Sequence, residues 1–359
     1  MLDLLRTIAA FIIDIGVLIF IHELGHYLAA RSQGVTVEVF SVGFGPALAR
    51  FKAKSGTVWQ ISALPLGGYV KMQGWGEESS TAPARPGSFA AAPLRSKAVI
   101  VAAGPLANLL LAVVIYAGLF MGAGQITTQP VVSQIQPGSP AAASHLLPGD
   151  RVLAIGGTAI ANFSDLQQIV AGHPDTVLDF TIERGGTTLS LPVTVGDAML
   201  DGEKIGHLGV IGTQSTLRRL PPGQAIAAAF QETGRQISAW FSGLGTLIMQ
   251  HKGLRDLAGP LGIAEISGQA AAMGLVPLIS LIALLSINLG LVNLIPIPVL
   301  DGGHLLFYAV EALIRRPVPE QAREAGLRVG VALILSLVVL VTFNDLARLG
   351  AVSWFTHLL

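Results

Sequence analysis

The sequence predicts a membrane α-helical protein with four transmembrane helices, a membrane-associated β-hairpin and an inserted domain built mostly of β-strands. Only 12% of the 359 residues are charged and 52% are hydrophobic, whereas a soluble protein usually carries about 25% charged residues. Four apolar stretches reach the roughly 20 residues that cross a bilayer. Between the second and third stretches, part of the chain alternates apolar and polar side chains, as strands do.

The charge balance and the absence of cysteine exclude several classes of protein. Lys and Arg total 22, Asp and Glu total 22, and the formal net charge is zero. A nucleic-acid binder would show a basic excess, and a disordered chain would combine low hydrophobicity with high net charge. Without cysteine there is no disulfide framework, no thiolate zinc site and no cysteine nucleophile. Any metal must be held by His, Asp or Glu.

The four predicted spans cover residues 7–30, 98–121, 275–300 and 327–346. The first resembles a secretory signal peptide in length, but it has no small-residue cleavage signature and continues directly into charged residues. We interpret it as a retained span. The membrane core is therefore predicted in two parts, residues 1–129 and residues 275–359.

The inserted domain is predicted over residues 130–215. Residues 178–183 alternate apolar and polar side chains, Gly185-Gly186 follows as a hairpin turn, and alternation resumes on the return strand. Residues 163–171 are predicted as a short helix. In the next segment, 216–274, an apolar stripe at helical spacing opposite a polar face predicts an amphipathic helix on the membrane surface, followed by a linker. A fifth span in this segment is the alternative.

Positive charges predict which side of the membrane each loop occupies. Residues 31–97 carry eight Lys or Arg, and the short segment 315–328 carries four. The whole segment between the second and third spans, residues 122–274, also carries eight, but over more than twice the length and with eleven acidic residues. Because Lys and Arg concentrate in cytoplasmic loops, the first loop and the loop before the last span are predicted to be cytoplasmic. The insert and both termini are predicted on the opposite face.

Residues 22–26 read His-Glu-Leu-Gly-His. Two histidines four residues apart lie above one another on a helix face, so both imidazoles reach one zinc ion at about 2 Å. Glu23 lies in the same turn and can accept the proton of an attacking water. Such a pattern arises by chance roughly 0.005 times in a chain of this composition. The alternative is a pair of interfacial histidines at a helix end.

A catalytic zinc site needs a third protein ligand, and Asp301 is the preferred candidate. No other acidic residue lies between Glu265 and Glu311. Because the first and third spans cross in the same direction, Asp301 should lie at the depth of the two histidines. His304 is the competing ligand, which we expect beside the metal site. Asp14 lies about 12 Å from His22 along a helix, too far to bind the same ion.

Other polar residues at membrane depth also need an explanation. Pro296 and Pro298 should unwind the end of the third span, which is tolerated beside a cavity, and the Asn293 amide could there hold a peptide backbone or an oxyanion. A simple kink is the alternative. Asn108 in the second span needs a partner, with helix packing as the default role. Strand-like pieces within 31–97 predict a hairpin that dips toward the site.

These residues resemble the site-2 protease family of intramembrane zinc metalloproteases, in particular its bacterial regulator-of-sigma-E protease type. The resemblance extends over nearly the whole chain. It rests on the segments His22–His26, Phe40–Gly45, Pro65–Met72, Gly104–Asn108, Gly259–Ile263 and Asn293–Gly303.

The resemblance implies a zinc ion as cofactor and assigns roles to particular residues. His22, His26 and Asp301 would bind the metal, and Glu23 would be the catalytic base. Substrate would be contacted by the residues Asn293, Gly67, Gly68 and Tyr69, the last three on the hairpin. The insert would be a PDZ domain, for which the turn Pro148–Val152 is typical. The best-known type has two such domains in tandem, and this chain has room for one.

The family also implies partners and a location. The substrate would be a single-span membrane protein, such as an anti-sigma factor already cut outside the membrane in an envelope stress response, or a remnant signal peptide. The enzyme would contact membrane lipid and no nucleic acid. It would lie in the bacterial inner membrane, with the PDZ domain periplasmic and the active site toward the cytoplasm.

Two other classes of function stay open at this point. A catalytically silent scaffold could bind partners through the PDZ domain, although such a protein has no need of Glu23. A membrane metalloenzyme acting on lipid is the third possibility, and oxygen-using enzymes of that class usually need more histidines at membrane depth.

Overall fold

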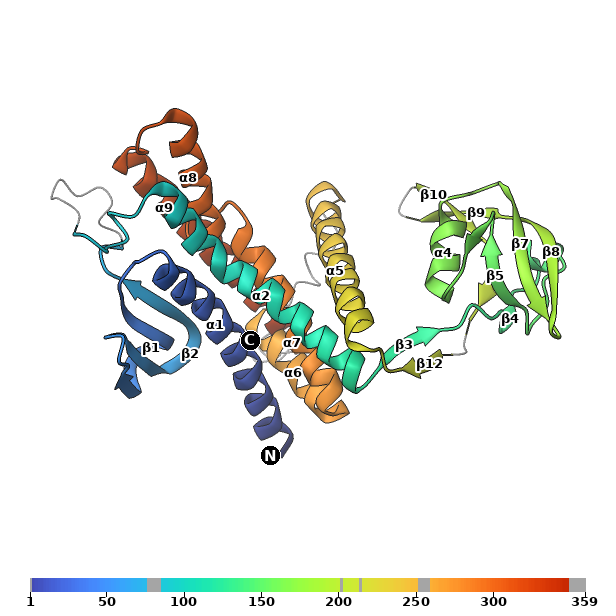
Figure 1. Ribbon diagram of the computed structural model, residues 1–359, viewed down its shortest axis with the longest axis horizontal. Helices are drawn as coiled ribbons and strands as arrows, with labels where there is room; N and C mark the ends of the chain where they lie inside the picture. The colour runs from blue at the N-terminus through green and yellow to red at the C-terminus, as the bar shows by residue number, and fades with distance from the viewer. Residues whose placement is uncertain (1, 76–84, 201–202, 213–214, 251–258, 349–359) are drawn as a thin grey trace, which may run out of the picture. The chain divides into compact units, whose positions relative to one another are not determined.

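The protein is described by a computed structural model (Figure 1). Contacts divide the chain into two compact units, a helical unit (residues 1–119 and 222–359) and an inserted unit (residues 120–221). The structure describes residues 2–75, 85–200, 203–212, 215–250 and 259–348.

Four helices of the described chain are long and apolar enough to cross a membrane. They are α1 (Leu2–Ser32), α2 (Leu94–Gly122), α7 (Leu275–Leu294) and α9 (Glu320–Arg348). Each contains most of one predicted stretch, so the prediction of four candidate spans is confirmed. Helices α1, α2 and α9 extend beyond the predicted stretches because their ends carry charged residues that still favour a helix.

The third span ends before the predicted residue 300, and the unwinding predicted at Pro296 and Pro298 is confirmed. Helix α7 stops at Leu294, and a second helix, α8 (Asp301–Ile314), begins after a break. The residue before a proline is driven out of the helical conformation, and Ile295, which precedes Pro296, has φ −61° and ψ 137°. Helix α8 is not predicted from the sequence, because Asp301 is expected at the end of the third span and the following residues are expected to form a loop.

The first loop folds into two long antiparallel strands, β1 (Val37–Lys52) and β2 (Val58–Met72). Residues 58–61 of β2 pair with both halves of β1, whereas residues 68–72 pair only with the first half. Strand β1 bends between its halves, where Gly43 and Gly45 adopt φ values of 93° and 85° that glycine tolerates. The end of β2 therefore forms an edge with no second strand partner in the described chain.

The predicted amphipathic helix is found as α5 (Pro222–Gln250), which is not among the four candidate spans. A further helix, α6 (Pro260–Met273), was not predicted and packs against α1. Asp345 of α9 is buried and accepts hydrogen bonds from the backbone N–H groups of Gly259 and Gly262, at 3.1 and 3.0 Å. A carboxylate in this place satisfies free donors at the start of α6.

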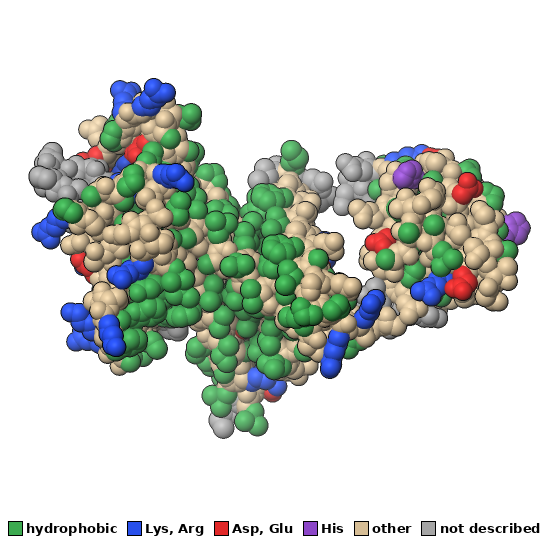
Figure 2. All heavy atoms as spheres, in the orientation of Figure 1, with side chains coloured by type: hydrophobic (Ala, Val, Ile, Leu, Met, Phe, Trp, Pro, Cys, Tyr) green, Lys and Arg blue, Asp and Glu red, His purple; other side chains and the backbone are tan. Residues whose placement is uncertain are grey.

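Apolar side chains cover the outside of the helical unit as well as its interior. Figure 2 shows hydrophobic side chains over most of the visible face of this unit, with charged side chains toward its margins. On α2, Leu106, Leu110 and Val114 are 55 to 60% exposed. A water-soluble protein rarely exposes so large an apolar surface, so this surface is suited to contact with lipid.

The inserted unit is mostly β-structure around one apolar core. Its four-stranded sheet has the order β6 (Thr158–Ala159), β5 (Arg151–Ile155), β7 (Val177–Arg184) and β8 (Thr187–Thr194). The predicted hairpin is confirmed, with Gly185 and Gly186 at φ 58° and 80°. The predicted helix is confirmed as α4 (Phe163–Ala171). The core centres on the buried residues Val152, Ile155, Leu166, Val170, Phe180, Ile182 and Val193.

Short antiparallel pairs complete the inserted unit. Strand β3 (Gln125–Thr128) pairs with β12 (Ser215–Arg218) where the chain enters and leaves the unit. The remaining elements are the pair β4 (Gln134–Ile135) and β11 (Val210–Ile211), the pair β9 (Gly196–Leu200) and β10 (Glu203–His207), and the short helix α3 (Pro140–Ala143).

Candidate metal centre

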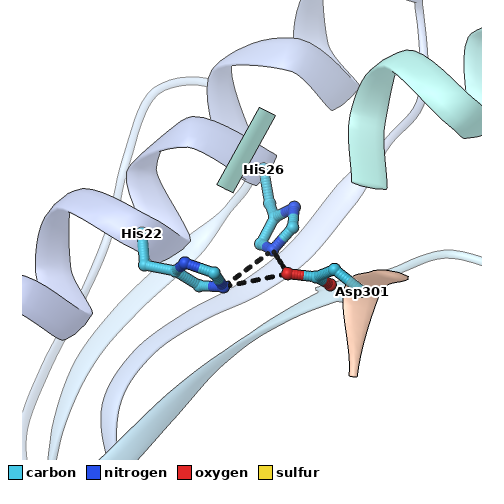
Figure 3. A group of neighbouring side chains, drawn as sticks. All are labelled: His22, His26 and Asp301. Carbon is cyan, nitrogen blue, oxygen red and sulfur yellow. Dashed lines mark hydrogen bonds and ion pairs between the residues drawn. The ribbon is translucent and has the colours of Figure 1, made fainter. Parts of the chain in front are cut away.

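Three side chains from two helices converge on one point in the helical unit. His22 and His26 lie one turn apart on α1, and Asp301 is the first residue of α8 (Figure 3). Oδ2 of Asp301 lies 3.2 Å from Nε2 of His22 and 3.5 Å from Nε2 of His26. The two Nε2 atoms are 3.2 Å apart. Two helices far apart in sequence thus place three potential ligand atoms together.

The spacing of these atoms fits a zinc ion. Tetrahedral zinc with bonds of about 2.0–2.1 Å separates its ligand atoms by about 3.3 Å. The three observed separations are 3.2, 3.2 and 3.5 Å. Two imidazoles and one carboxylate are also a ligand set that catalytic zinc uses, with the fourth position left for water or substrate.

Local structure keeps Asp301 ionised and in place. Burial alone would raise the pKa of the Asp301 carboxyl, but hydrogen bonds with His22 and His26 lower this pKa to about 2. Its place in the first turn of α8 also favours a negative charge. A side chain at Gly302 or Gly303 would collide with backbone atoms of residues 294–298. The glycine pair therefore lets α8 start in close contact with the non-helical segment that follows α7.

Helix α2 packs against His26 and holds its ring in position. Nδ1 of His26 donates to the carbonyl oxygen of Ile100 at 2.8 Å, which orients the ring with Nε2 toward Asp301 and His22. One turn further along α2, a methyl group at Gly104 would collide with the His26 ring. Gly25 on α1 likewise has no room for a side chain, because Ala103 and Ala107 lie against it. Glycine on both helices permits this close approach.

Asn108, another turn along α2, lies beside His22. The side chain is fully buried, and its Nδ2 atom is 3.4 Å from Nδ1 of His22. From the sequence we predict that Asn108 needs a partner, with helix packing as its default role. A buried amide in an apolar span was the available signal for this contact.

All eight residues predicted for the site line a single cavity of about 540 Å³ in the helical unit. Besides the three candidate ligands, they are Glu23, Asn293, Gly67, Gly68 and Tyr69. Sequence reasoning missed other lining residues, including Phe44, Met72 and Trp75. These are apolar residues of the segment between the first two spans, and nothing in their sequence pattern distinguishes a cavity wall from a core.

His304 lines the same cavity but does not belong to the cluster of candidate ligands found in the described chain. Its ring lies 5.7 Å from that of Trp75 and 6.5 Å from that of Tyr308, measured between centroids. Asp14 is fully buried on α1 and does not line the cavity.

The edge of β2 forms one wall of the cavity. Tyr69 is held there by a hydrogen bond from Nε2 of Gln60 at 3.1 Å and stacks on Phe44. Gly67 has φ 125°, and a side chain at Gly68 would lie 2.7 Å from both Cγ2 of Ile19 and the carbonyl oxygen of Ser41. Gly67 and Gly68 therefore line the cavity with backbone atoms and add no side chain of their own.

The four candidate spans and the three candidate ligands indicate a membrane metalloprotein, and comparison with known proteins makes the class specific. The family model described as peptidase family M50 matches residues 10–337. The chain therefore belongs to peptidase family M50 and is a zinc-dependent metalloprotease of a membrane.

Several relatives are similar over nearly their whole length. A protein of Agrobacterium fabrum, provisionally named a zinc metalloprotease, is 39% identical over 361 residues, covering 95% of this chain and 96% of the relative. Metalloprotease MmpA of Caulobacter vibrioides is 34% identical over 394 residues, covering 97% of both. Regulator of sigma-E protease RseP of Salmonella typhimurium is 31% identical over 450 residues, covering 97% of this chain and 100% of the relative.

Proposed function

We propose that this protein is an intramembrane endopeptidase in which His22, His26 and Asp301 bind zinc and Glu23 is the catalytic base. The observation that carries the proposal is the position of Glu23. Its side chain is only 9% exposed, yet it lines the same cavity as the three candidate ligands. A charged residue buried at this depth is costly unless it has a function.

The residues around the cavity have complementary tasks in peptide hydrolysis. When bound, zinc polarises the scissile carbonyl and lowers the pKa of water toward about 7. Glu23 accepts the proton of the attacking water and passes it to the leaving amine. The Asn293 amide donates to the carbonyl oxygen as negative charge develops there. Partners on α2 orient both histidine rings, because Nδ1 of His26 donates to the Ile100 carbonyl oxygen and Nδ1 of His22 faces the Asn108 amide.

The substrate segment binds in extended form along the edge of β2. A peptide bond within a helix is shielded by its own hydrogen bonds, so a transmembrane substrate must unwind before water can attack. Residues 68–72 have a free edge and line the cavity at several positions. An unwound stretch can pair with such an edge as an added strand. Gly67, Gly68 and Tyr69 then contact the substrate backbone.

The biological substrate is a single-span membrane protein that a first protease has already trimmed outside the membrane. An anti-sigma factor in an envelope stress response and a remnant signal peptide both fit this description. The enzyme acts in the bacterial inner membrane, with the cavity toward the cytoplasm and the inserted unit in the periplasm. The distribution of Lys and Arg supports this orientation, and the name of the Salmonella relative supports the regulatory role.

The inserted unit acts as a single PDZ domain that restricts access. The Salmonella alignment extends over 450 residues, whereas this chain has 359, a difference close to the size of one such unit. A domain that admits only trimmed substrates would make cleavage depend on the first cut.

The catalytic assignment is tested by Glu23→Gln, which keeps the size of the side chain and removes the base. The full-length variant is expressed with a tagged, pre-trimmed single-span substrate in membranes. Cleavage should fall by about 100-fold or more, while zinc content stays at the wild-type level. Glu265→Gln, at a residue outside the cavity, is the control. Undiminished cleavage by Glu23→Gln would refute the assignment.

A deletion tests the role of the inserted unit. Because Thr128 pairs with Ser215, replacing residues 129–214 with Asn-Gly closes β3 and β12 into a two-residue hairpin. The shortened protein should cleave trimmed and untrimmed substrates equally, whereas the full chain prefers the trimmed one. If the deletion leaves this preference unchanged, the gating role is wrong.

A further inference from the structure

The amide of Asn108 lies at Nδ1 of His22, whereas Nε2 of the same ring faces Asp301. Nδ2 of Asn108 lies 3.4 Å from Nδ1 of His22, and the Oδ1 atom of Asn108 is buried with no hydrogen-bond partner in the described chain. The backbone carbonyl of Asn108 accepts from the Ser286 hydroxyl at 2.8 Å. Asn108 is therefore fixed through its backbone, while no hydrogen bond to Oδ1 prevents the amide from turning.

The observed orientation of the amide suits His22 without a metal. An amide nitrogen is only a donor, so Nδ1 of His22 must be the acceptor and the proton lies on Nε2. That Nε2–H group then donates to Oδ2 of Asp301, 3.2 Å away. In this tautomer His22 cannot bind a metal through Nε2, because its lone pair is occupied by the proton.

Metal binding reverses these requirements. A neutral imidazole that binds zinc through Nε2 carries its proton on Nδ1, and this N–H group needs an acceptor. A half-turn of the Asn108 amide about its Cβ–Cγ bond presents Oδ1 in place of Nδ2. His26 receives the same support from a fixed acceptor, the Ile100 carbonyl.

We propose that Asn108 is a positioning residue for zinc, whose amide turns to present Oδ1 to Nδ1–H of His22 when the metal binds. The inference rests on the proposed ligand set of His22, His26 and Asp301. It assigns the two histidines different supports on one helix face: a carbonyl at Ile100 that always accepts, and an amide at Asn108 that serves either tautomer.

Zinc affinity tests the proposal without reference to catalysis. Full-length protein in detergent is stripped of metal and titrated with zinc against a chromophoric chelator. Asn108→Leu removes the acceptor at similar volume and should weaken zinc binding about 10- to 100-fold. Asn108→Asp offers an oxygen in either orientation and should bind within a few-fold of wild type. Ser267→Ala, at a buried hydroxyl on α6, is the control and should not change the affinity.

The outcomes separate this proposal from the ligand set. Loss of zinc in Asp301→Ala together with wild-type affinity in Asn108→Leu would overturn the role of Asn108 alone. Wild-type affinity in Asp301→Ala would overturn the ligand set itself. If Asn108→Leu does not fold, Asn108→Asp decides, because a loss of affinity beyond 10-fold there contradicts the proposal.

The tautomer is also directly observable in the wild-type protein. In a sample with ¹⁵N-labelled histidine, the His22 signals are those absent from His22→Gln. Without zinc they should show the proton on Nε2, and with zinc the proton on Nδ1. A proton on Nδ1 in both states would show that the amide does not turn.

Discussion

Gly104 is the position where the smallest substitution should most damage the metal centre. An alanine methyl group there would lie 2.5 Å from Cε1 and 2.9 Å from Cδ2 of His26, and closer still to Nε2, whereas ordinary contact begins at 3.4 Å. Relief of the Cε1 contact alone therefore moves the ring by about 0.9 Å, several times the roughly 0.2 Å within which metal–ligand distances are acceptable. Such a shift also breaks the hydrogen bond to Ile100.

The fold itself should tolerate Gly104→Ala. The added methyl group would meet the imidazole ring of His26. This ring borders a cavity of about 540 Å³, so it has space to turn away. Alanine in a helix interior is favoured over glycine by about 1 kcal/mol. The variant should thus unfold no earlier than wild type without zinc, yet bind zinc about 100-fold more weakly or worse, by the usual effect of a 1 Å misplacement.

The assay compares Gly104→Ala with Gly118→Ala in full-length protein in detergent. Gly118 is on the same helix, and a methyl group there meets no atom within 4 Å. Zinc affinity is measured by chelator competition, and unfolding of the zinc-free protein by temperature. Gly118→Ala should keep wild-type zinc affinity. Equal affinity in both variants would refute the close contact between α1 and α2 at the metal centre.

Three further predictions concern the third ligand, a helix start and the inserted core. Asp301→Ala should lose bound zinc while His304→Ala keeps it in metal analysis of purified protein; the reverse result would make His304 the ligand. Asp345→Ala should lower stability in detergent by about 1–2 kcal/mol, because α6 loses its capping carboxylate; an unchanged unfolding midpoint would contradict this. Phe180→Ala should cost about 3–5 kcal/mol and expose the inserted unit to limited proteolysis, whereas resistance equal to wild type would count against the assigned core.

Sequence patterns predicted what is encoded locally. The bounds of α4 are those expected from the sequence, because Asn162 and Asp165 form reciprocal hydrogen bonds that fix its start. The carboxylate of Asp301 was placed near the histidines by the direction of the spans alone. The carbonyl of Ile100 could not be predicted, because a backbone acceptor carries no side-chain signal. The double pairing of β2 was equally hidden, since it depends on a bend in β1.

The segment between α7 and α8 shows how an interruption between two helices can position a metal ligand. Pro296 and Pro298 end α7 near the depth of the candidate centre, and the six-residue break turns the chain so that α8 begins there. A continuous helix through 275–301 would present Asp301 on a side of the helix set by its 100° rotation per residue. Beginning a helix at Asp301 instead aims both its carboxylate and the positive end of the helix at the site. Pro296 and Pro298 therefore interrupt the membrane span and, by doing so, allow Asp301 to reach the candidate metal centre.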